Sequence, residues 1–187
     1  DSTVISLSDL GPVGEKFSNI GISVYTLKIN REFPNPFILI RLLLILKKIR
    51  PDVIQTWLYH ADLIGGIAGK IMGVPVVWSI RHNNLSPDVN KKKTLFVVKL
   101  LALMSSYIPA KIISCSISSK LTHSQYGYSA NNIEVIPNGF DLDQFFPDKE
   151  AYKSVRIELD LKKDQIIIGL VGRFDRQKDH QNFIESA

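Results

Sequence analysis

Short apolar segments alternate with longer helical segments along this chain, and this alternation limits its possible folds more than any other feature. Runs rich in Val and Ile recur, and stretches with apolar residues at helical spacing separate them. Chains with this order form parallel sheets with right-handed crossovers and helices on both faces. We therefore predict an α/β fold built on a doubly wound parallel sheet.

The expected elements follow from periodicity, glycine stops and proline positions. The predicted strands are 4–7, 22–27, 52–56, 76–80, 111–115, 133–136 and 166–171. The predicted helices are 11–20, 37–49, 60–72, 90–107, 118–126 and one that begins near Lys178, with Pro36 opening the second. Small residues along the third helix, Gly65, Ala68 and Gly69, permit a close approach to the sheet.

Composition restricts the chemistry further. The chain is 45% hydrophobic and 22% charged, which is ordinary for a globular protein. Its single cysteine, Cys115, excludes an intrachain disulfide and a multi-cysteine zinc site, and we expect a reducing, cytoplasmic location. No run of about 18 uncharged apolar residues predicts a transmembrane helix.

The two ends of the 187-residue chain predict a piece of a larger protein. Asp1 is not an initiator methionine, and Ala187 falls inside a predicted amphipathic helix. Two domains of about 100 to 200 residues each need roughly twice this length.

The segment from Val135 to Lys178 carries the most specific motifs. It begins with Val-Ile-Pro-Asn-Gly-Phe-Asp, continues with Phe-Phe-Pro, and ends with Gly-Arg-Phe-Asp-Arg-Gln-Lys after the apolar run 166–171. The Pro-Asn-Gly sequence favours a turn. The apolar run predicts a strand buried on both faces, followed by a glycine turn with two cations where a helix begins. That arrangement suits a diphosphate.

These motifs and the order of elements resemble glycosyltransferase family 4, retaining enzymes whose two Rossmann-like domains face each other across a cleft in the GT-B fold. The resemblance implies that residues 1–140 form the N-terminal, acceptor-side domain without its first strand and helix. Residues 141–164 then form an interdomain connector, and residues 165–187 begin the donor-binding domain.

The resemblance also implies roles for particular residues. His82 and Asn83, after the predicted strand 76–80, match residues that contact the transferred sugar and the acceptor. Arg173 and Lys178 match residues that hold the donor diphosphate and stabilise its charge. The further donor-binding positions are Gly172, Asn138 and Gly139. The structural alternatives are a solvated loop around His82 and ordinary surface charges at Arg173 and Lys178.

No metal or cofactor is expected, because the nucleotide-sugar is a substrate. Asp141 and Asp143 have the Asp-X-Asp spacing of metal-dependent glycosyltransferases. They follow a Pro-Asn-Gly turn and precede Phe-Phe-Pro, as the family's connector does, so we assign them to the connector.

The expected activity is transfer of a sugar, with retention, from a nucleotide-diphosphate donor to a saccharide or lipid-linked acceptor in polysaccharide or glycolipid synthesis. The family's downstream acidic pair lies beyond Ala187, so we expect the chain alone to be inactive. The rivals are a sugar-nucleotide epimerase of similar fold and a non-catalytic sugar-nucleotide or membrane-binding protein. No recognised motif indicates nucleic-acid binding.

Charge is concentrated in the first part of the chain. Residues 1–110 hold 13 Lys and Arg against 7 Asp and Glu, a net charge of +6. In helix 37–49, Arg41 and Lys48 share a face with Leu44 and Ile45. This pattern is equally typical of a helix packed on a sheet and of a peripheral helix on an anionic membrane.

Overall fold

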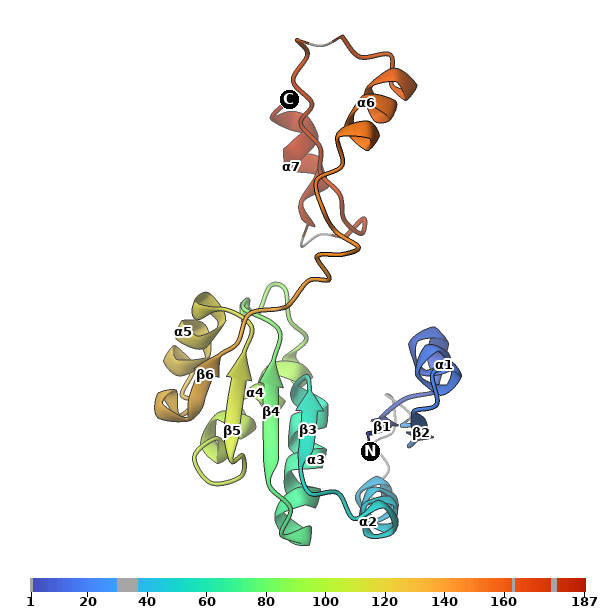
Figure 1. The fold of residues 1–187 in the computed structure, drawn as a ribbon. Coiled ribbons are helices and arrows are strands. Elements are labelled where there is room, and N and C mark those ends of the chain that lie inside the picture. Colours follow the sequence, from blue (N-terminus) through green and yellow to red (C-terminus); the bar gives the residue numbers. More distant parts are fainter. Residues whose placement is uncertain (1, 30–36, 163, 176–177) are drawn as a thin grey trace. The chain divides into compact units, whose positions relative to one another are not determined.

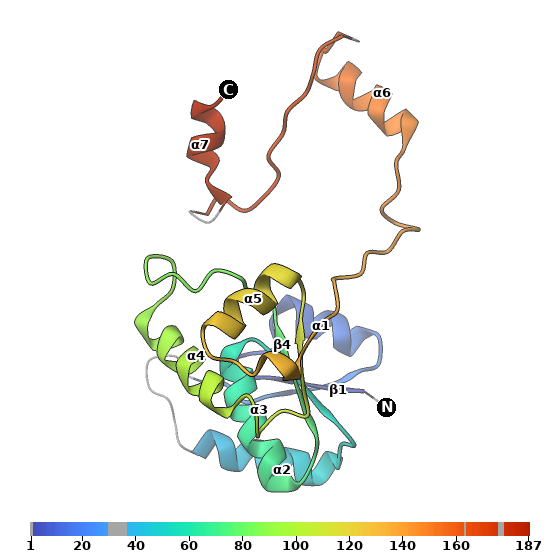
Figure 2. The ribbon, with the colours of Figure 1, turned by 90° about the vertical axis from the view of Figure 1, so that its left-hand side faces the viewer.

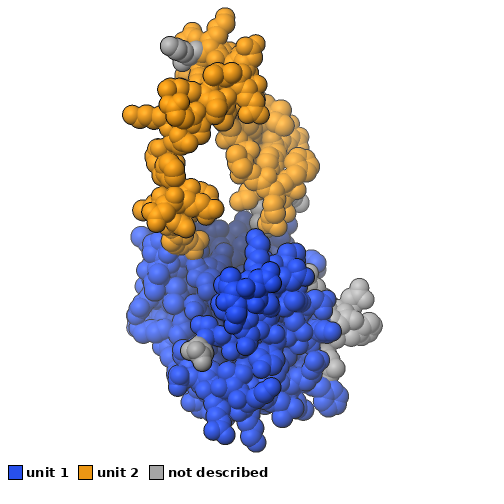
Figure 3. Space-filling model, turned by 45° about the vertical axis from the view of Figure 1, so that its right-hand side comes forward, with its two compact units in different colours: residues 1–137 blue, residues 138–187 orange. Residues whose placement is uncertain are grey.

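The computed structural model describes residues 2–29, 37–162, 164–175 and 178–187. The chain divides into two compact units, unit 1 with residues 1–137 and unit 2 with residues 138–187, coloured separately in Figure 3. The expected helix start at Pro36 and the pair Arg176 and Gln177 lie outside the described residues.

Unit 1 alternates strands and helices in the predicted order (Figure 1). Its strands are β1 (Thr3–Ser6), β2 (Ser23–Thr26), β3 (Ile54–Trp57), β4 (Val76–Ile80), β5 (Lys111–Ser114) and β6 (Ile133–Val135). Its helices are α1 (Gly11–Asn19), α2 (Phe37–Ile49), α3 (Tyr59–Met72), α4 (Lys92–Met104), α5 (Ile117–Gln125) and the short 3₁₀ helix η1 (Ala130–Asn132). The predicted α/β class with parallel strands is confirmed.

All strand pairs in the described part of the chain are parallel, but they form two sheets. β1 pairs with β2, while the second sheet has the order β3-β4-β5-β6. The described strands therefore make a two-stranded and a four-stranded parallel sheet. Among the described residues, β1 pairs only with β2, and β3 pairs only with β4. No described strand pair therefore joins the two sheets.

The larger sheet packs its apolar face against α3 and α4 (Figure 2). Alternate residues of β4, Val76, Trp78 and Ile80, are at most 1% exposed. They share a core cluster with Val98 and Leu101 of α4. Val76, Trp78 and Ile80 thus lie on one face of the strand, and Ser79 is buried on the other.

Helix α3 lies very close to this sheet. A Cβ on Gly69 would stand 2.1 Å from Cγ2 of Val76, and one on Gly66 would stand 2.9 Å from Nε1 of Trp78. The helix ends at Gly73, whose φ of +70° suits glycine. The expectation that small residues permit close approach is confirmed.

A second core cluster joins α2 to the β1-β2 sheet. It contains Leu27, after β2, and Ile38, Leu42 and Leu46 of α2, with Ala68 of α3. These residues of α2 recur every four positions, so one stripe of the helix is buried.

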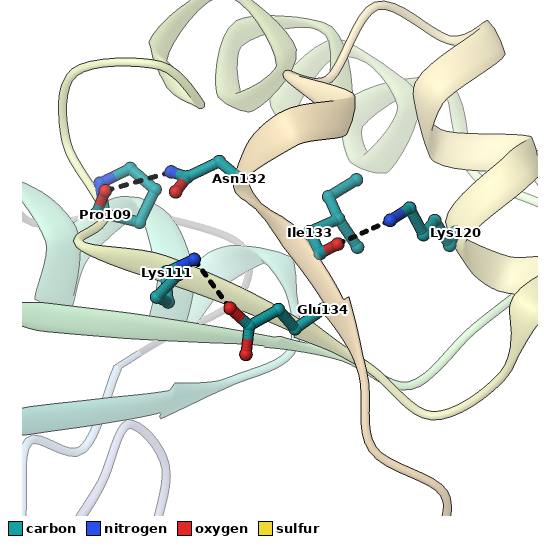
Figure 4. Close-up of polar contacts among 6 residues, drawn as sticks. All are labelled: Pro109, Lys111, Lys120, Asn132, Ile133 and Glu134. Carbon is teal, nitrogen blue, oxygen red and sulfur yellow. Dashed lines mark hydrogen bonds and ion pairs between the residues drawn. The ribbon is translucent and has the colours of Figure 1, made fainter.

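Side chains from neighbouring elements hold the edge strand β6 (Figure 4). Lys120 Nζ donates to the Ile133 carbonyl oxygen at 2.7 Å, and Asn132 Nδ2 donates to that of Pro109 at 3.1 Å. Lys111 and Glu134 form an exposed ion pair across β5 and β6 at 2.6 Å. These contacts fix the end of unit 1, directly before Pro137, Asn138 and Gly139, which form no turn although their sequence favours one.

Unit 2 contains α6 (Lys149–Glu158) and the short α7 (His180–Glu185). Residues 149–158 were predicted to be part of the connector, and the helix α6 was not predicted. Asp148 begins this helix by accepting a hydrogen bond from the Glu150 N–H at 2.9 Å. At its other end, Arg156 donates to the carbonyl oxygens of Lys162 and Gln165.

The predicted buried strand 166–171 is not a strand in the structure. Ile166 is 89% exposed and Val171 is fully exposed. An isolated strand leaves its backbone groups and apolar side chains in water, and the described residues provide no neighbouring strand for this segment.

Candidate functional site

Because β3, β4, β5 and β6 are parallel, their carboxyl ends lie at one edge of the larger sheet. Ligands of doubly wound folds bind beyond such an edge. The loop after β4 begins there with Arg81 and His82, both half-buried, and with the exposed Asn83 and Asn84. The structure thus places the predicted His82 and Asn83 together at this edge.

An aromatic residue at the end of β3 accompanies them. The guanidinium carbon of Arg81 lies 4.2 Å from the centroid of the Trp57 ring, within the range of a cation–π interaction. Trp57 remains 52% exposed. Trp57 was not among the predicted site residues, although an aromatic side chain at a strand's carboxyl end is a usable signal.

Helix α5 holds the main chain of His82 in place. Ser119 Oγ donates a hydrogen bond to the His82 carbonyl oxygen at 2.8 Å. Ser119 is itself positioned because its N–H donates to Ser116 Oγ, the cap of α5, at 3.0 Å. His82 Nε2 is buried and has no hydrogen-bond partner among the described residues, so one polar group of this ring is unused.

A buried imidazole lies beneath this loop. His123 Nδ1 is 2.8 Å from the Ser119 carbonyl oxygen, which only accepts, so Nδ1 carries the proton. Burial lowers the pKa of His123. The hydrogen bond to the Ser119 carbonyl partly offsets this decrease, and nearby His82 adds to it. In the neutral ring Nε2 then accepts from the Tyr59 hydroxyl at 2.9 Å. This chain of bonds links α3, α5 and the loop after β4.

Asp62 is a second buried polar residue, 1% exposed, behind the same edge. Its Oδ1 accepts a hydrogen bond from Thr56 Oγ1 at 2.6 Å. Burial raises the pKa of Asp62 to about 7, although the hydrogen bonds from Thr56 and the Ser79 main chain oppose the shift. Burial, followed by the charge of Asp62, also raises the pKa of Tyr59.

A pocket of about 570 Å³ lies between the loop after β4 and the last turns of α5. Asn83 lines it beside the predicted contact residue His82. The other lining residues are Asn84, Leu85, Ser86, Thr122, Gln125 and Tyr126. Thr122 and Gln125 of α5 and the following Tyr126 were missed from the sequence because they are distant from this loop along the chain.

The predicted donor-binding residues belong to unit 2. Gly172 lies close to Lys178. A Cβ on Gly172 would stand 3.5 Å from Cγ of Lys178. His180 Nε2 donates to the Arg173 carbonyl oxygen at 2.8 Å. Gly172, Arg173 and Lys178 are thus brought together, and all three are exposed. Asn138 and Gly139 begin the unit, directly after its boundary.

One part of the donor-site prediction is wrong. The two cations were expected where a buried strand passes into a helix, but residues 166–171 form no strand and α7 begins at His180. The contacts of Gly172 with Lys178 and of Arg173 with His180 replace that arrangement. That these cations and His82 act on one ligand stays a prediction.

Asp141 has a local structural role. Its Oδ1 accepts hydrogen bonds from the main-chain N–H groups of Asp143 at 3.0 Å and Gln144 at 3.3 Å. Such bonds stabilise a turn. Across the described ranges, no group of three His, Cys, Asp or Glu side chains has the geometry of a metal site. Likewise, none of the described helices is long and apolar enough to cross a membrane.

Comparison with known proteins identifies related sequences. The sequence model of Glycosyltransferase Family 4 matches residues 1–144. The chain is 29% identical over 150 residues to the UDP-Gal:alpha-D-GlcNAc-diphosphoundecaprenol alpha-1,3-galactosyltransferase of Escherichia coli, a match covering 80% of this chain and 39% of the relative. It is 26% identical to EpsF of Bacillus subtilis (strain 168), covering 68% and 34%. The chain therefore spans well under half the length of these relatives.

Solved structures share the fold. HepE of Anabaena, in complex with UDP-glucose, superposes with a TM-score of 0.76 at 19% identity, over 98% of this chain and 48% of HepE. A glycosyltransferase from Rickettsia africae ESF-5 has a TM-score of 0.59 at 16% identity, over 87% of this chain and 42% of that one. UDP-N-acetylglucosamine 2-epimerase from Rickettsia bellii has a TM-score of 0.51 at 15% identity, over 84% and 43%. At these identities the comparison establishes the fold alone.

Proposed function

Since the chain belongs to glycosyltransferase family 4, we propose that the protein transfers a sugar from a nucleotide-diphosphate donor to an acceptor hydroxyl with retention of anomeric configuration. The observation that carries this proposal is the strand-end site, where His82 is fixed by Ser119 beside Asn83. The Escherichia coli relative, named for UDP-galactose and a diphosphoundecaprenol-linked acceptor, supports a UDP-sugar donor and a lipid-linked acceptor. We place the activity at the cytoplasmic face of the membrane, in polysaccharide or glycolipid synthesis.

In the proposed reaction the acceptor oxygen bonds to the anomeric carbon as the bond from that carbon to the diphosphate breaks. The acceptor proton passes to a donor phosphate oxygen on the same face. His82 contacts the transferred sugar, and its unused Nε2 supplies a hydrogen-bonding group. Arg173 and Lys178 stabilise the charge that develops on the departing diphosphate.

The transfer assay uses the intact protein with UDP-galactose and an alkyl-linked N-acetylglucosaminyl diphosphate. We expect His82→Ala to lower kcat/KM by about tenfold or more, the effect of losing a hydrogen bond worth about 1.5 kcal/mol. His60→Ala, which changes an exposed histidine on α3, is the matched control and should leave the rate unchanged. Equal rates for both variants and wild type would remove His82 from the site.

The donor side is tested by calorimetry with UDP. Arg173→Ala and Lys178→Ala should each weaken binding by about tenfold, because each removes a charge-assisted contact to phosphate. Lys149→Ala, at an exposed position of α6, is the charge-matched control. Unchanged UDP affinity in both test variants would contradict the assignment.

We further propose that transfer requires no divalent metal, because Asp141 uses its carboxylate within a turn. Activity should persist in excess chelator. Loss of activity in chelator, restored by manganese, would instead favour a metal site at Asp141 and Asp143.

The reaction products distinguish an epimerase from a transferase. An epimerase converts UDP-N-acetylglucosamine without any acceptor, whereas a transferase releases UDP only when an acceptor hydroxyl reacts. A non-catalytic binding protein would bind UDP and give neither product.

The exposed face of α2 supports contact with an anionic membrane. Phe37, Ile40 and Leu44 are each more than half exposed, beside the exposed Lys47 and Lys48. Apolar side chains next to cations are typical of peripheral helices. Arg41 also donates to the Leu27 carbonyl oxygen at 3.2 Å, so it has a structural role as well.

Vesicle co-sedimentation of the intact protein tests this contact. Binding should require anionic lipid and weaken with salt, because the attraction is screened. The test variant neutralises Lys47, Lys48, Lys91, Lys92 and Lys93. The control neutralises Lys16, Lys28, Lys149, Lys153 and Lys162. Equal binding to neutral and anionic vesicles, or equal loss in both variants, would leave α2 as an ordinary core helix.

A further inference from the structure

The pocket beside the loop after β4 is built from two segments of unit 1. Asn83, Asn84 and Ser86 come from the loop, Thr122 and Gln125 come from α5, and Tyr126 directly follows that helix. Its volume of about 570 Å³ lies within the range of small-molecule sites.

The loop side of the pocket has a fixed shape. Asn84 Oδ1 accepts from the Ser86 N–H at 2.9 Å, and Asn90 Nδ2 donates to the carbonyl oxygens of Asn84 and Ser86 at 2.7 and 3.0 Å. Leu85 is 7% exposed and belongs to the main core cluster. The pocket wall is thus ordered before any ligand binds, which reduces the entropy cost of binding.

Several polar groups around the pocket remain available. Within the described part of the chain, no hydrogen bond engages the side chains of Asn83, Thr122, Gln125 or Tyr126. Together they offer amide donors, amide acceptors and two hydroxyl groups. The Tyr126 ring is 37% exposed and adds an apolar surface.

The lining indicates the class of ligand. All seven lining side chains are uncharged, so none of them supplies a cation for a phosphate or an anion for an amine. Amide and hydroxyl groups around an aromatic ring match a neutral polyol such as a pyranose, whose hydroxyls both donate and accept. The peptide bond that joins Asn83 to His82 connects this lining to the proposed transfer site.

We infer that this pocket binds the neutral saccharide part of the acceptor and that Thr122 and Gln125 contact it. This inference rests on the proposed function and deepens it. The acceptor diphosphate lies outside the pocket, because the lining has no charge to meet it.

The test uses the intact protein, UDP-galactose and alkyl-linked N-acetylglucosaminyl diphosphate. Thr122→Val and Gln125→Ala should each raise the acceptor KM by about fivefold, the effect of losing one hydrogen bond of about 1 kcal/mol. UDP affinity and kcat should stay within about twofold of wild type. Leu121→Ala, on the exposed surface of the same helix and outside the pocket, is the matched control.

If wild type transfers sugar and both pocket variants keep the wild-type acceptor KM, the inference is overturned. The proposed function is then unaffected. Weakened UDP binding in these variants would assign the pocket to the nucleotide and would also overturn it.

Direct binding separates the inference from the activity. If wild type transfers no sugar, saturation-transfer NMR with methyl α-N-acetylglucosaminide decides the matter. A signal that is lost in Gln125→Ala and kept in Leu121→Ala supports the pocket while the proposed function fails. The absence of a signal from wild type overturns both.

Discussion

Two similar apolar runs, one in each unit, differ in structure: one forms a buried strand and the other forms no strand. Residues 76–80 form β4, where Val76, Trp78 and Ile80 are at most 1% exposed. Residues 166–171 are at least as rich in aliphatic residues, yet they form no strand, and Ile168 is 78% exposed. The difference lies in their surroundings, because β4 pairs with β3 and β5 and is covered by α3 and α4. An apolar run gives a segment the capacity to be a strand, and its neighbours supply the pairing and burial.

The largest test of this contrast makes the same substitution in both units. Ile112 in β5 is fully buried, so Ile112→Ala should lower the free energy of unfolding by about 2–5 kcal/mol through lost burial and a cavity. Ile168→Ala should change it by no more than about 0.5 kcal/mol. Urea unfolding of the intact protein measures both. Similar losses at the two sites would mean that residues 166–171 are buried in solution.

Glycine substitutions sharpen the comparison. Gly69→Ala puts a Cβ 2.1 Å from Val76 Cγ2 and 3.1 Å from the Val74 carbonyl oxygen, a clash that should cost about 1–3 kcal/mol. The helix propensity of Ala offsets at most about 1 kcal/mol of this. Gly139→Ala, with no atom within 4 Å of the new Cβ, is the control and should be neutral. A stabilised Gly69→Ala variant in thermal unfolding would show that α3 is not packed closely on β4.

A buried carboxyl group gives unit 1 its own pH dependence. Because the pKa of Asp62 is raised to about 7, the folded state holds this proton more tightly than the unfolded chain does. The Asp62 contribution to stability is therefore fully present below its ordinary pKa of about 4 and is lost as the pH rises to about 7. The slope in this range reaches at most about 1.4 kcal/mol per pH unit.

Unfolding from pH 4 to 8 checks this dependence. Asp62→Asn keeps an oxygen acceptor for Thr56 and should remove the Asp62 part of the slope, whereas the opposite contribution of His123, whose pKa is lowered, should remain. Asp164→Asn, at an exposed position of unit 2, should leave the slope as in wild type. A slope that persists in Asp62→Asn would have to arise from other groups.

The candidate site was partly predictable. His82 and Asn83 followed from a polar sequence after an apolar run together with the family resemblance, and the structure places both at the carboxyl edge of the sheet. Trp57, Thr122 and Gln125 were not found, because their relation to the site depends on how separate segments pack. The predicted donor-binding residues Gly172, Arg173 and Lys178 lie close together through the Gly172–Lys178 and Arg173–His180 contacts, without the expected strand.

The sequence by itself determined the order of strands and helices in unit 1, because side-chain periodicity and proline or glycine stops act within a few residues. Tertiary structure alone decided that the strands form two sheets, that residues 166–171 stay unpaired, and that the loop after β4 and α5 line one pocket. The hydrogen bond from Ser119 to His82 joins residues 37 positions apart. Such contacts depend on which distant segments meet, and local patterns of residue type do not encode that.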